Sequence, residues 1–112
     1  MTVQFIGIDL AKNVFQIHGV DTHGECILVK RLRRDSLLPF LAALNKCTIG
    51  IEACTGAFYW QRAFEDLGYQ VKIIAPQYVK PFVMSQKNDR NDAEAICTAL
   101  RQPNMRFVPT KN

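Results

Sequence analysis

The stretch VQFIGID at residues 3–9 is an almost continuous apolar run that ends in a carboxylate. Such a run is typical of a strand that is covered on both faces of a sheet. Two more strands are predicted at residues 13–20 and 26–31, because the intervening sequence DTHG has the composition of a turn. We expect these three strands to form an antiparallel meander.

The middle of the chain alternates helical and strand patterns. A helix that begins at Asp35 or Ser36 is predicted by the spacing of four apolar residues on one face, Leu37, Phe40, Leu41 and Leu44. Buried strands are predicted at residues 47–52 and 70–74, with a second helix between them that ends at Gly68.

The C-terminal third is predicted as a proline-punctuated loop at residues 76–81, with a helical turn near residues 79–85 as an alternative, a last helix at residues 89–101 and an extended tail at residues 103–112. A meander followed by two crossovers gives a mixed α/β sheet of five strands in the order 3-2-1-4-5, with helices on its faces. This is the ribonuclease-H-like architecture, and we assign residues 1–102 to that domain.

The composition is that of one ordinary globular domain. The chain has 112 residues, of which 48% are hydrophobic and 21% charged, and this excludes a collagen-like or disordered protein. No apolar run is long enough to cross a bilayer, and the N-terminus lacks the basic region of a signal peptide. We therefore expect a cytoplasmic protein without a membrane partner. A net charge of +4 is a weak indication of a polyanionic partner.

The four cysteines form no CxxC pair, so reduced thiols that act as small hydrophobic residues are expected. His18, His23 and Cys26 are conceivable zinc ligands. A structural zinc site needs a fourth ligand, however, and the sequence offers none beside them.

Two carboxylates come directly after predicted buried strands. Asp9 follows the first strand and Glu52 follows the fourth. A carboxylate at such a place is costly unless it is solvated, capped or bound to a cation. Taken singly, each also has a local explanation, because Asp9 can begin a turn and Glu52 can lie at the N-terminus of the next helix.

Asp89 and Asp92 lie in the sequence KNDRNDAEA, where the last helix is predicted to start. A local explanation is again available, because an Asp followed by an acid three residues later resembles a helix cap. On a helical wheel both aspartates nevertheless continue the apolar stripe that contains Ala93, Ile96 and Leu100. Two inward carboxylates at this spacing repel each other, and a bound cation would relieve the repulsion.

The predicted topology brings these acids together. Sites in open sheets form beyond the carboxyl ends of neighbouring strands, and the first and fourth strands are predicted neighbours. A last helix packed across that edge would add its two aspartates. Four carboxylates without His or Cys suit Mg²⁺ or Mn²⁺, and two such ions can hold a phosphodiester between its attacking and leaving oxygens.

Five motifs follow one another in order: IGIDLAK at residues 6–12, IEAC at 51–54, PQYVKP at 76–81, KNDRNDAEAI at 87–96 and RQPNMRFVP at 101–109. Together they resemble the DEDD-type insertion-sequence transposases, the family numbered one hundred and ten, which is related to the Piv/MooV DNA invertases. The resemblance implies a RuvC-like fold and a set of catalytic, metal-binding acids, namely Asp9, Glu52, Asp89 and Asp92. It also implies DNA cutting and strand exchange with a divalent metal, a structured guide RNA in some members, and a homo-oligomer of the full-length protein.

The sequence departs from that family in one respect. Family members continue into a second domain that supplies a nucleophilic serine, whereas the serines here, Ser36 and Ser85, match no nucleophile motif. We therefore expect residues 103–112 to lead toward a C-terminal domain that this sequence does not contain.

Basic residues fall into two groups. The sequence KRLRR at residues 30–34 lies at the predicted sheet edge, where positive charge also discourages edge-to-edge aggregation. As a nucleic-acid contact, its Arg33 and Arg34 would bind backbone phosphates. A second group lies nearer the acids and is predicted to hold the scissile strand, namely Lys12, Lys80, Lys87 and Arg90. Of the neighbours Tyr59 and Trp60, one is expected at the surface and the other in the core.

Three functions are compatible with the sequence. The first is a metal-dependent transposase or nuclease domain. The second is a truncated module that binds DNA, RNA or a partner chain without catalysis. The third is half of an actin-like or sugar-kinase fold, because GIDL at residues 7–10 resembles the first phosphate motif of that class. Against this third function, no glycine closely follows Asp9 and no second phosphate loop is visible.

Overall fold

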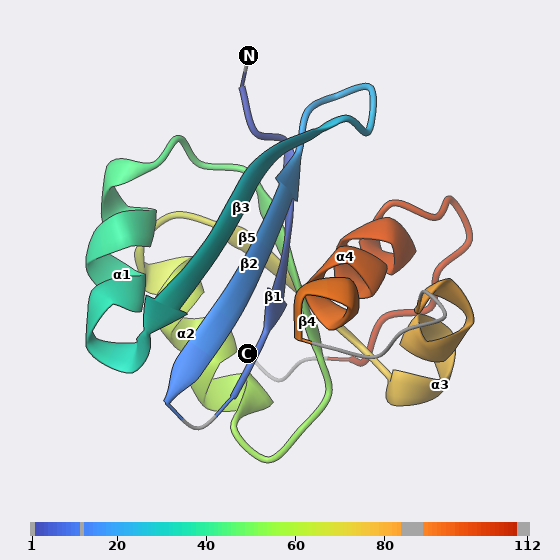
Figure 1. The fold of residues 1–112 in the computed structure, drawn as a ribbon. Helices are drawn as coiled ribbons and strands as arrows, with labels where there is room; N and C mark the ends of the chain where they lie inside the picture. The colour runs from blue at the N-terminus through green and yellow to red at the C-terminus, as the bar shows by residue number, and fades with distance from the viewer. Residues whose placement is uncertain (1, 12, 84–88, 110–112) are drawn as a thin grey trace.

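A single mixed sheet of five strands forms the centre of the fold (Figure 1). The computed structural model describes residues 2–11, 13–83 and 89–109, and at Asp89 and Arg90 it describes the backbone alone. The strands are β1 (Phe5–Asp9), β2 (Val14–Val20), β3 (Cys26–Arg33), β4 (Thr48–Glu52) and β5 (Gln70–Ile74). Their order is β3-β2-β1-β4-β5, with β2 antiparallel to both of its neighbours and β4 parallel to both of its own. The predicted ribonuclease-H-like sheet is confirmed.

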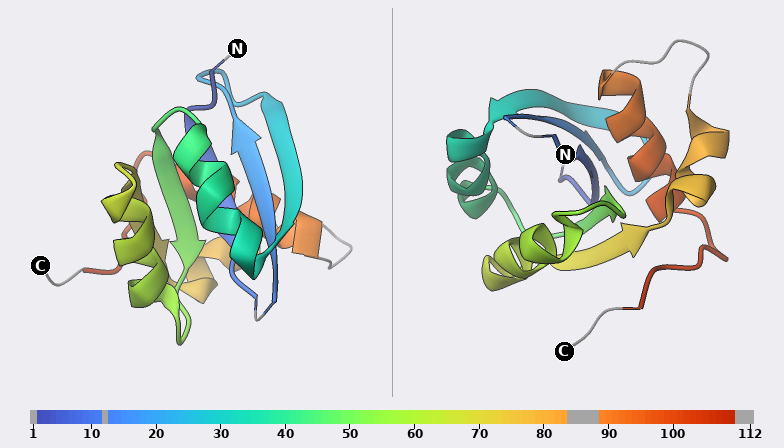
Figure 2. Two further views of the ribbon diagram at one scale, coloured as in Figure 1. Left: turned by 90° about the vertical axis from the view of Figure 1, so that its left-hand side faces the viewer. Right: turned by 90° about the horizontal axis from the view of Figure 1, so that it is seen from below.

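Helices cover both faces of this sheet (Figure 2). On one face lie α1 (Arg34–Ala43) and α2 (Ala57–Asp66), and on the other lies α4 (Asp89–Leu100), with α3 (Pro76–Val79) and the short 3₁₀ helix η1 (Lys80–Phe82) beside it. The layer under α1 and α2 holds the larger core, because alternate residues of the central strands point into it. Its fully buried strand residues include Ile6, Ile8, Ile49 and Ile51.

Helix α4 lies in unusually close contact with the two central strands because each presents a glycine to it. A Cβ atom on Gly7 would lie 2.5 Å from the backbone nitrogen of Cys97, and one on Gly50 would lie 3.2 Å from Cβ of Leu100. The Cys97 thiol also donates to the carbonyl of Phe5 at 3.7 Å. Small side chains on the helix, such as the fully buried Ala93, permit the same close approach.

Two predicted boundaries were wrong. The segment expected as a loop at residues 76–81 forms α3 and then η1, so only the alternative helical turn near residues 79–85 agrees in part with the structure. Pro76 is tolerated in the first turn of α3, because the N–H that a proline lacks would have no partner within the helix there. Strand β3 continues to Arg33 and α1 begins at once with Arg34, whose backbone N–H donates to the carbonyl of Asn13 at 2.9 Å. The basic cluster therefore spans the junction between a strand and a helix.

The described part of the tail packs along β5. The Val108 N–H donates to the carbonyl of Ile73 at 2.8 Å, and Phe107 forms an antiparallel bridge with Ile74. Phe107 also packs against the smaller core beneath α4. The domain limit at residue 102 remains a prediction, and the extended segment that follows it is docked on the sheet as far as Val108.

Among the helices in the described part of the chain, none is long and apolar enough to span a bilayer.

The contact at Gly7 makes a stability prediction. Gly7→Ala is expected to lower the free energy of unfolding by about 2 kcal/mol, because the new methyl group meets helix backbone that cannot move aside. Urea unfolding followed by Trp60 fluorescence measures the change. Gly56→Ala is the control, since its Cβ would lie 3.6 Å from the nearest Trp60 atom. Because Gly56 is the N-cap of α2, where alanine is disfavoured, this substitution should cost about 0.5 kcal/mol, still well below the loss at Gly7. Equal effects of the two substitutions would contradict a tight α4 contact.

The cysteines make a second prediction, because they differ in exposure. Cys26 and Cys54 are exposed, whereas burial raises the pKa of Cys47 to about 11 and that of Cys97 to about 12. The thiolate is the reactive form, so at pH 8 Ellman's reagent should titrate Cys26 and Cys54 rapidly. Cys47 and Cys97 should react only after guanidinium is added. Rapid reaction of all four thiols in the native protein would contradict this burial.

Candidate functional site

Asp9 and Glu52 end the two central strands at the same edge of the sheet. Strands β1 and β4 run parallel with Ile8 opposite Ile51, so the two acids are the next residues on adjacent strands. Side chains two residues apart share a face of a sheet, and Gly7 and Gly50 face α4. Asp9 and Glu52 therefore lie on the α4 side, and both are half-buried.

Helix α4 brings Asp92 to Glu52. The two side chains line one cavity of about 300 Å³, together with Lys80 and an apolar wall formed by Pro76, Val79, Val83 and Ile96. Burial raises the pKa of Glu52, and the negative charge of Asp92 raises it further. Two carboxylates are thus held close enough to repel each other in a partly dry site.

The four predicted acids are not all placed equally. Glu52 and Asp92 share the cavity, and Asp9 ends the neighbouring strand on the same face. Asp89 begins α4, one turn before Asp92, but its side chain lies outside the described residues. Within the described part of the chain, no group of three or more His, Cys, Asp or Glu side chains is close enough to hold a metal ion.

The donor chemistry at this edge fits a hard divalent cation. Among the described residues, the cavity lining offers carboxylate oxygens and neither imidazole nor thiol, which is the preference of Mg²⁺ and Mn²⁺. The raised pKa of Glu52 reflects an unfavourable negative charge that a cation would stabilise. His18 and Cys26, considered above for zinc, lie 3.9 Å apart (Nδ1 to Sγ). No third ligand among the described residues completes a site with them.

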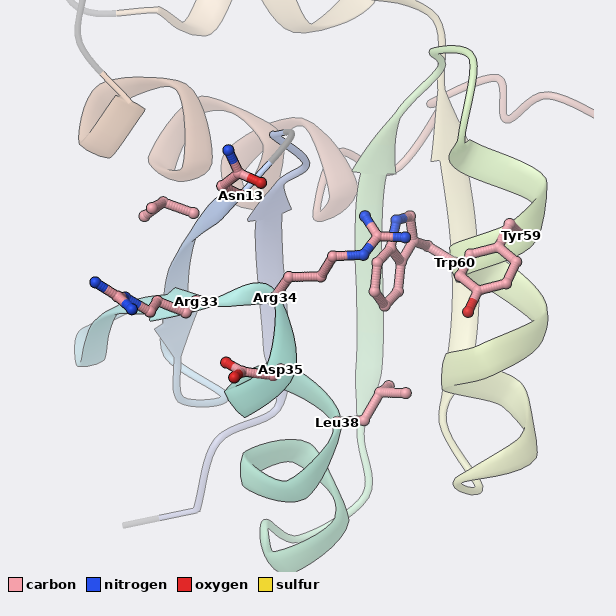
Figure 3. A pocket seen from close by; sticks show the side chains of 8 residues that line it. Asn13, Arg33, Arg34, Asp35, Leu38, Tyr59 and Trp60 are labelled. Carbon is pink, nitrogen blue, oxygen red and sulfur yellow. The ribbon is translucent and has the colours of Figure 1, made fainter.

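The predicted nucleic-acid contacts divide between two places. Lys80 lines the acidic cavity, so it lies near the acids, as predicted. Lys12 and Lys87 lie outside the described residues, as does the side chain of Arg90. Arg33 and Arg34 lie elsewhere, in a separate hollow between α1 and α2 (Figure 3).

That hollow contains aromatic residues whose role the sequence analysis missed. Tyr59 is 60% exposed and Trp60 is 6% exposed, which confirms that the pair divides between surface and core. The Arg34 guanidinium carbon lies 5.0 Å from the centroid of the Trp60 ring. The sequence FYW at residues 58–60 was the available signal, but only the packing of α1 against α2 brings Arg34 to it.

The repulsion at Glu52 makes a pH-dependent prediction for the metal-free protein. Because the pKa of Glu52 is higher in the folded than in the unfolded state, its ionisation costs stability as the pH rises through that window. Glu52→Gln should therefore raise the melting temperature at pH 7 in EDTA, and the gain should disappear near pH 4, where Glu52 is protonated. Glu65→Gln, an exposed acid on α2, is the matched control. A melting temperature that falls at pH 7 in Glu52→Gln would show that the charge is already compensated.

Known proteins resemble this chain throughout its length. The family model for DEDD-type IS110 transposases, described as "Transposase", matches residues 6–112. The chain is 51% identical over 106 residues to the "Transposase for insertion sequence element IS1328" of Yersinia enterocolitica, covering 95% of this chain and 32% of that protein. It is 47% identical over 112 residues to the "Probable family 20 transposase" of Pseudomonas aeruginosa, covering 100% of this chain and 33% of that protein. The chain thus spans about a third of the length of these relatives.

Two solved structures of RuvC from Thermus thermophilus share the fold. RuvC in complex with a Holliday junction substrate has a TM-score of 0.62, with 11% identity over 96% of this chain and 100% of that chain. The other RuvC structure has a TM-score of 0.56, with 11% identity over 93% and 99% of the two chains. At this identity the likeness shows a RuvC-like fold, as the motifs implied. With the family model matching nearly every residue, the chain belongs to the DEDD-type IS110 transposase family.

Proposed function

We propose that this chain is the DNA-cleaving domain of a transposase, which uses Mg²⁺ or Mn²⁺ to break and join phosphodiester bonds. The observation that carries the proposal is the pairing of Glu52 with Asp92 in one cavity at the carboxyl edge of the central strands. These two acids, with Asp9 and Asp89, are the proposed ligands of two metal ions. The relatives from Yersinia enterocolitica and Pseudomonas aeruginosa are named as transposases, which supports the DNA substrate.

The residues around the cavity have separable roles in this proposal. Divalent ions, when bound, stabilise the charge that develops on the attacking and leaving oxygens of a phosphodiester. Glu52 and Asp92 hold negative charge where such ions bind, and Lys80 lies beside them to contact a phosphate oxygen of the strand. The apolar wall that includes Val79 and Ile96 limits water at the acids and so strengthens their electrostatic interactions.

Further partners belong to the same proposal. The family resemblance suggests a structured guide RNA and a homo-oligomer of the full-length protein, with residues 103–112 leading toward a second domain. The RuvC structure with a Holliday junction concerns another protein of the same fold, and it supports branched DNA as a substrate to test here.

A second candidate function is a nucleic-acid-binding module without catalysis. The observation that favours it is that no described group of three acids is close enough to hold a metal ion. The chain also spans only about a third of its relatives' length, so residues outside it are available to complete a catalytic site in them.

Metal binding is tested by thermal unfolding. Saturating Mn²⁺ should raise the melting temperature by several degrees, since a ligand at 100 times its Kd adds about 2.7 kcal/mol to stability. Asp92→Asn should abolish this increase, and so should Asp9→Asn. Glu94→Gln, on the same helix but outside the cavity lining, should retain it. If manganese still raised the melting temperature of Asp92→Asn, the ion would bind elsewhere and the proposed set of ligands would be wrong.

Strand cleavage separates the two candidate functions. Linear, supercoiled and four-way-junction DNA are incubated with the protein and Mn²⁺, and nicked products are measured on denaturing gels. Cleavage that requires both Glu52 and Asp92 supports the proposed function. A manganese-dependent rise in melting temperature without cleavage of any of these substrates supports the non-catalytic module.

A further inference from the structure

The hollow between α1 and α2 is larger than the acidic cavity and chemically different from it. It measures about 740 Å³ and lies on the face of the sheet opposite α4. Its charged lining consists of Arg33, Arg34 and Asp35. The rest of the lining is formed by Asn13, Val14, Leu38, Tyr59 and Trp60. We call it the basic-aromatic groove.

The floor of this groove is a cluster of three tightly packed aromatic rings. Trp60 packs edge-on against Phe15 with 4.9 Å between ring centroids, and lies 5.6 Å from Phe64 in a tilted arrangement. Both phenylalanines are fully buried, so the tryptophan cannot shift without disturbing the core. Arg34 extends across the groove to the Trp60 ring (Figure 3). Arg33 also lines the groove, but its side chain points away from Trp60. The cation–π contact holds the guanidinium plane in place.

The wall of the groove offers a second, exposed ring. Tyr59 is 60% exposed and meets Trp60 edge-on at a centroid distance of 5.1 Å. An exposed ring of this kind can stack on an unpaired base, while the neighbouring guanidinium binds a phosphate. Because a base inside a duplex is already stacked on its neighbours, the pairing of an open ring with arginines suits a single strand.

The groove adjoins a hollow near the ends of the two central strands. A second hollow of about 490 Å³ shares Arg34 and Trp60 with it. The remaining lining of that hollow is Leu10, Ala11, Cys54, Thr55 and Gly56, which follow Asp9 and Glu52 in the chain almost directly. The two hollows thus adjoin each other at Arg34 and Trp60, and the second one lies beside the segments that follow β1 and β4.

We propose that the basic-aromatic groove binds single-stranded DNA, with one base stacked on Tyr59 and the adjoining phosphates held by Arg34 and Arg33. The strand would run from the acidic edge, past Leu10 and Thr55, into the groove. Its direction relative to the acids rests on the proposed function, but the binding itself requires no metal. This separation allows the groove to be tested in EDTA, independently of cleavage.

The test uses the full chain in EDTA, titrated with a twelve-residue oligo-dT and followed by fluorescence. Trp60 is the single tryptophan of the chain, so a strand in the groove should quench its emission. Tyr59→Ala should weaken binding by roughly 5- to 100-fold, the usual loss for one stacked base. Phe58→Ala is the matched control, because Phe58 is 48% exposed beside Tyr59 but does not line the groove, and it should leave the affinity unchanged.

The arginines are tested by charge and by shape. Arg34→Lys keeps the charge but loses the planar guanidinium that lies 5.0 Å from the Trp60 ring centroid, and it should weaken binding by more than Arg62→Ala. Arg62 is exposed on α2 and does not line the groove. Arg33→Ala should reduce the salt dependence of binding by about one counterion. Equal losses in Arg34→Lys and Arg62→Ala would mean diffuse electrostatic attraction and would overturn the proposal.

Three further outcomes decide the matter. Wild-type affinity in Tyr59→Ala would exclude the stacked base, provided circular dichroism shows the variant folded as wild type. Tighter binding of oligo-rU than of oligo-dT would assign the groove to RNA and overturn the DNA assignment. Glu94→Gln, which lies outside the lining of both the groove and the acidic cavity, should bind oligo-dT as wild type does, and a loss of binding in this variant would contradict a site confined to the groove. Because the titration is carried out in EDTA, a failed metal test leaves its result standing.

Discussion

The close contact of α4 with the central strands is the constraint on which the rest of this molecule depends. Gly7 and Gly50 let the helix lie against the backbone of β1 and β4, and any larger side chain at Gly7 would collide with it. That contact sets the height of the helix above the sheet. It thereby decides that Asp92 reaches the cavity of Glu52 and does not project into solvent beyond the sheet edge.

The cavity is built at some cost to the folded state. Glu52 is half-buried next to another carboxylate, and its pKa is raised by both burial and that charge. The opposite layer contributes the stability that tolerates this arrangement, because Ile6, Ile8 and Ile51 are fully buried under α1 and α2. One face of the sheet therefore supplies cohesion, and the other carries the unfavourable charges that make the site useful.

The hydrophobic pattern of the sequence predicted much of the fold, but it did not predict most of the contacts that form the basic-aromatic groove. The apolar runs and the turn between β2 and β3 were enough to predict the strand order, and parallel neighbours placed Asp9 beside Glu52 before any coordinates. Helix α3 was missed because Pro76 and the nearby Pro81 resemble helix breakers, although Pro76 suits a first turn. The contact of Arg34 with Trp60 was missed because it arises only where two helices pack, which no local spacing encodes.

The acids come from distant parts of the sequence, and this affects when the site can exist. Asp9 and Glu52 leave the ribosome well before α4, because synthesis proceeds from the N-terminus. Until residues 89–100 have emerged and docked on Gly7, the nascent chain holds only part of the acidic set. The order of the elements along the chain thus keeps the proposed metal site incomplete until this one helix has been synthesised and has packed against the sheet.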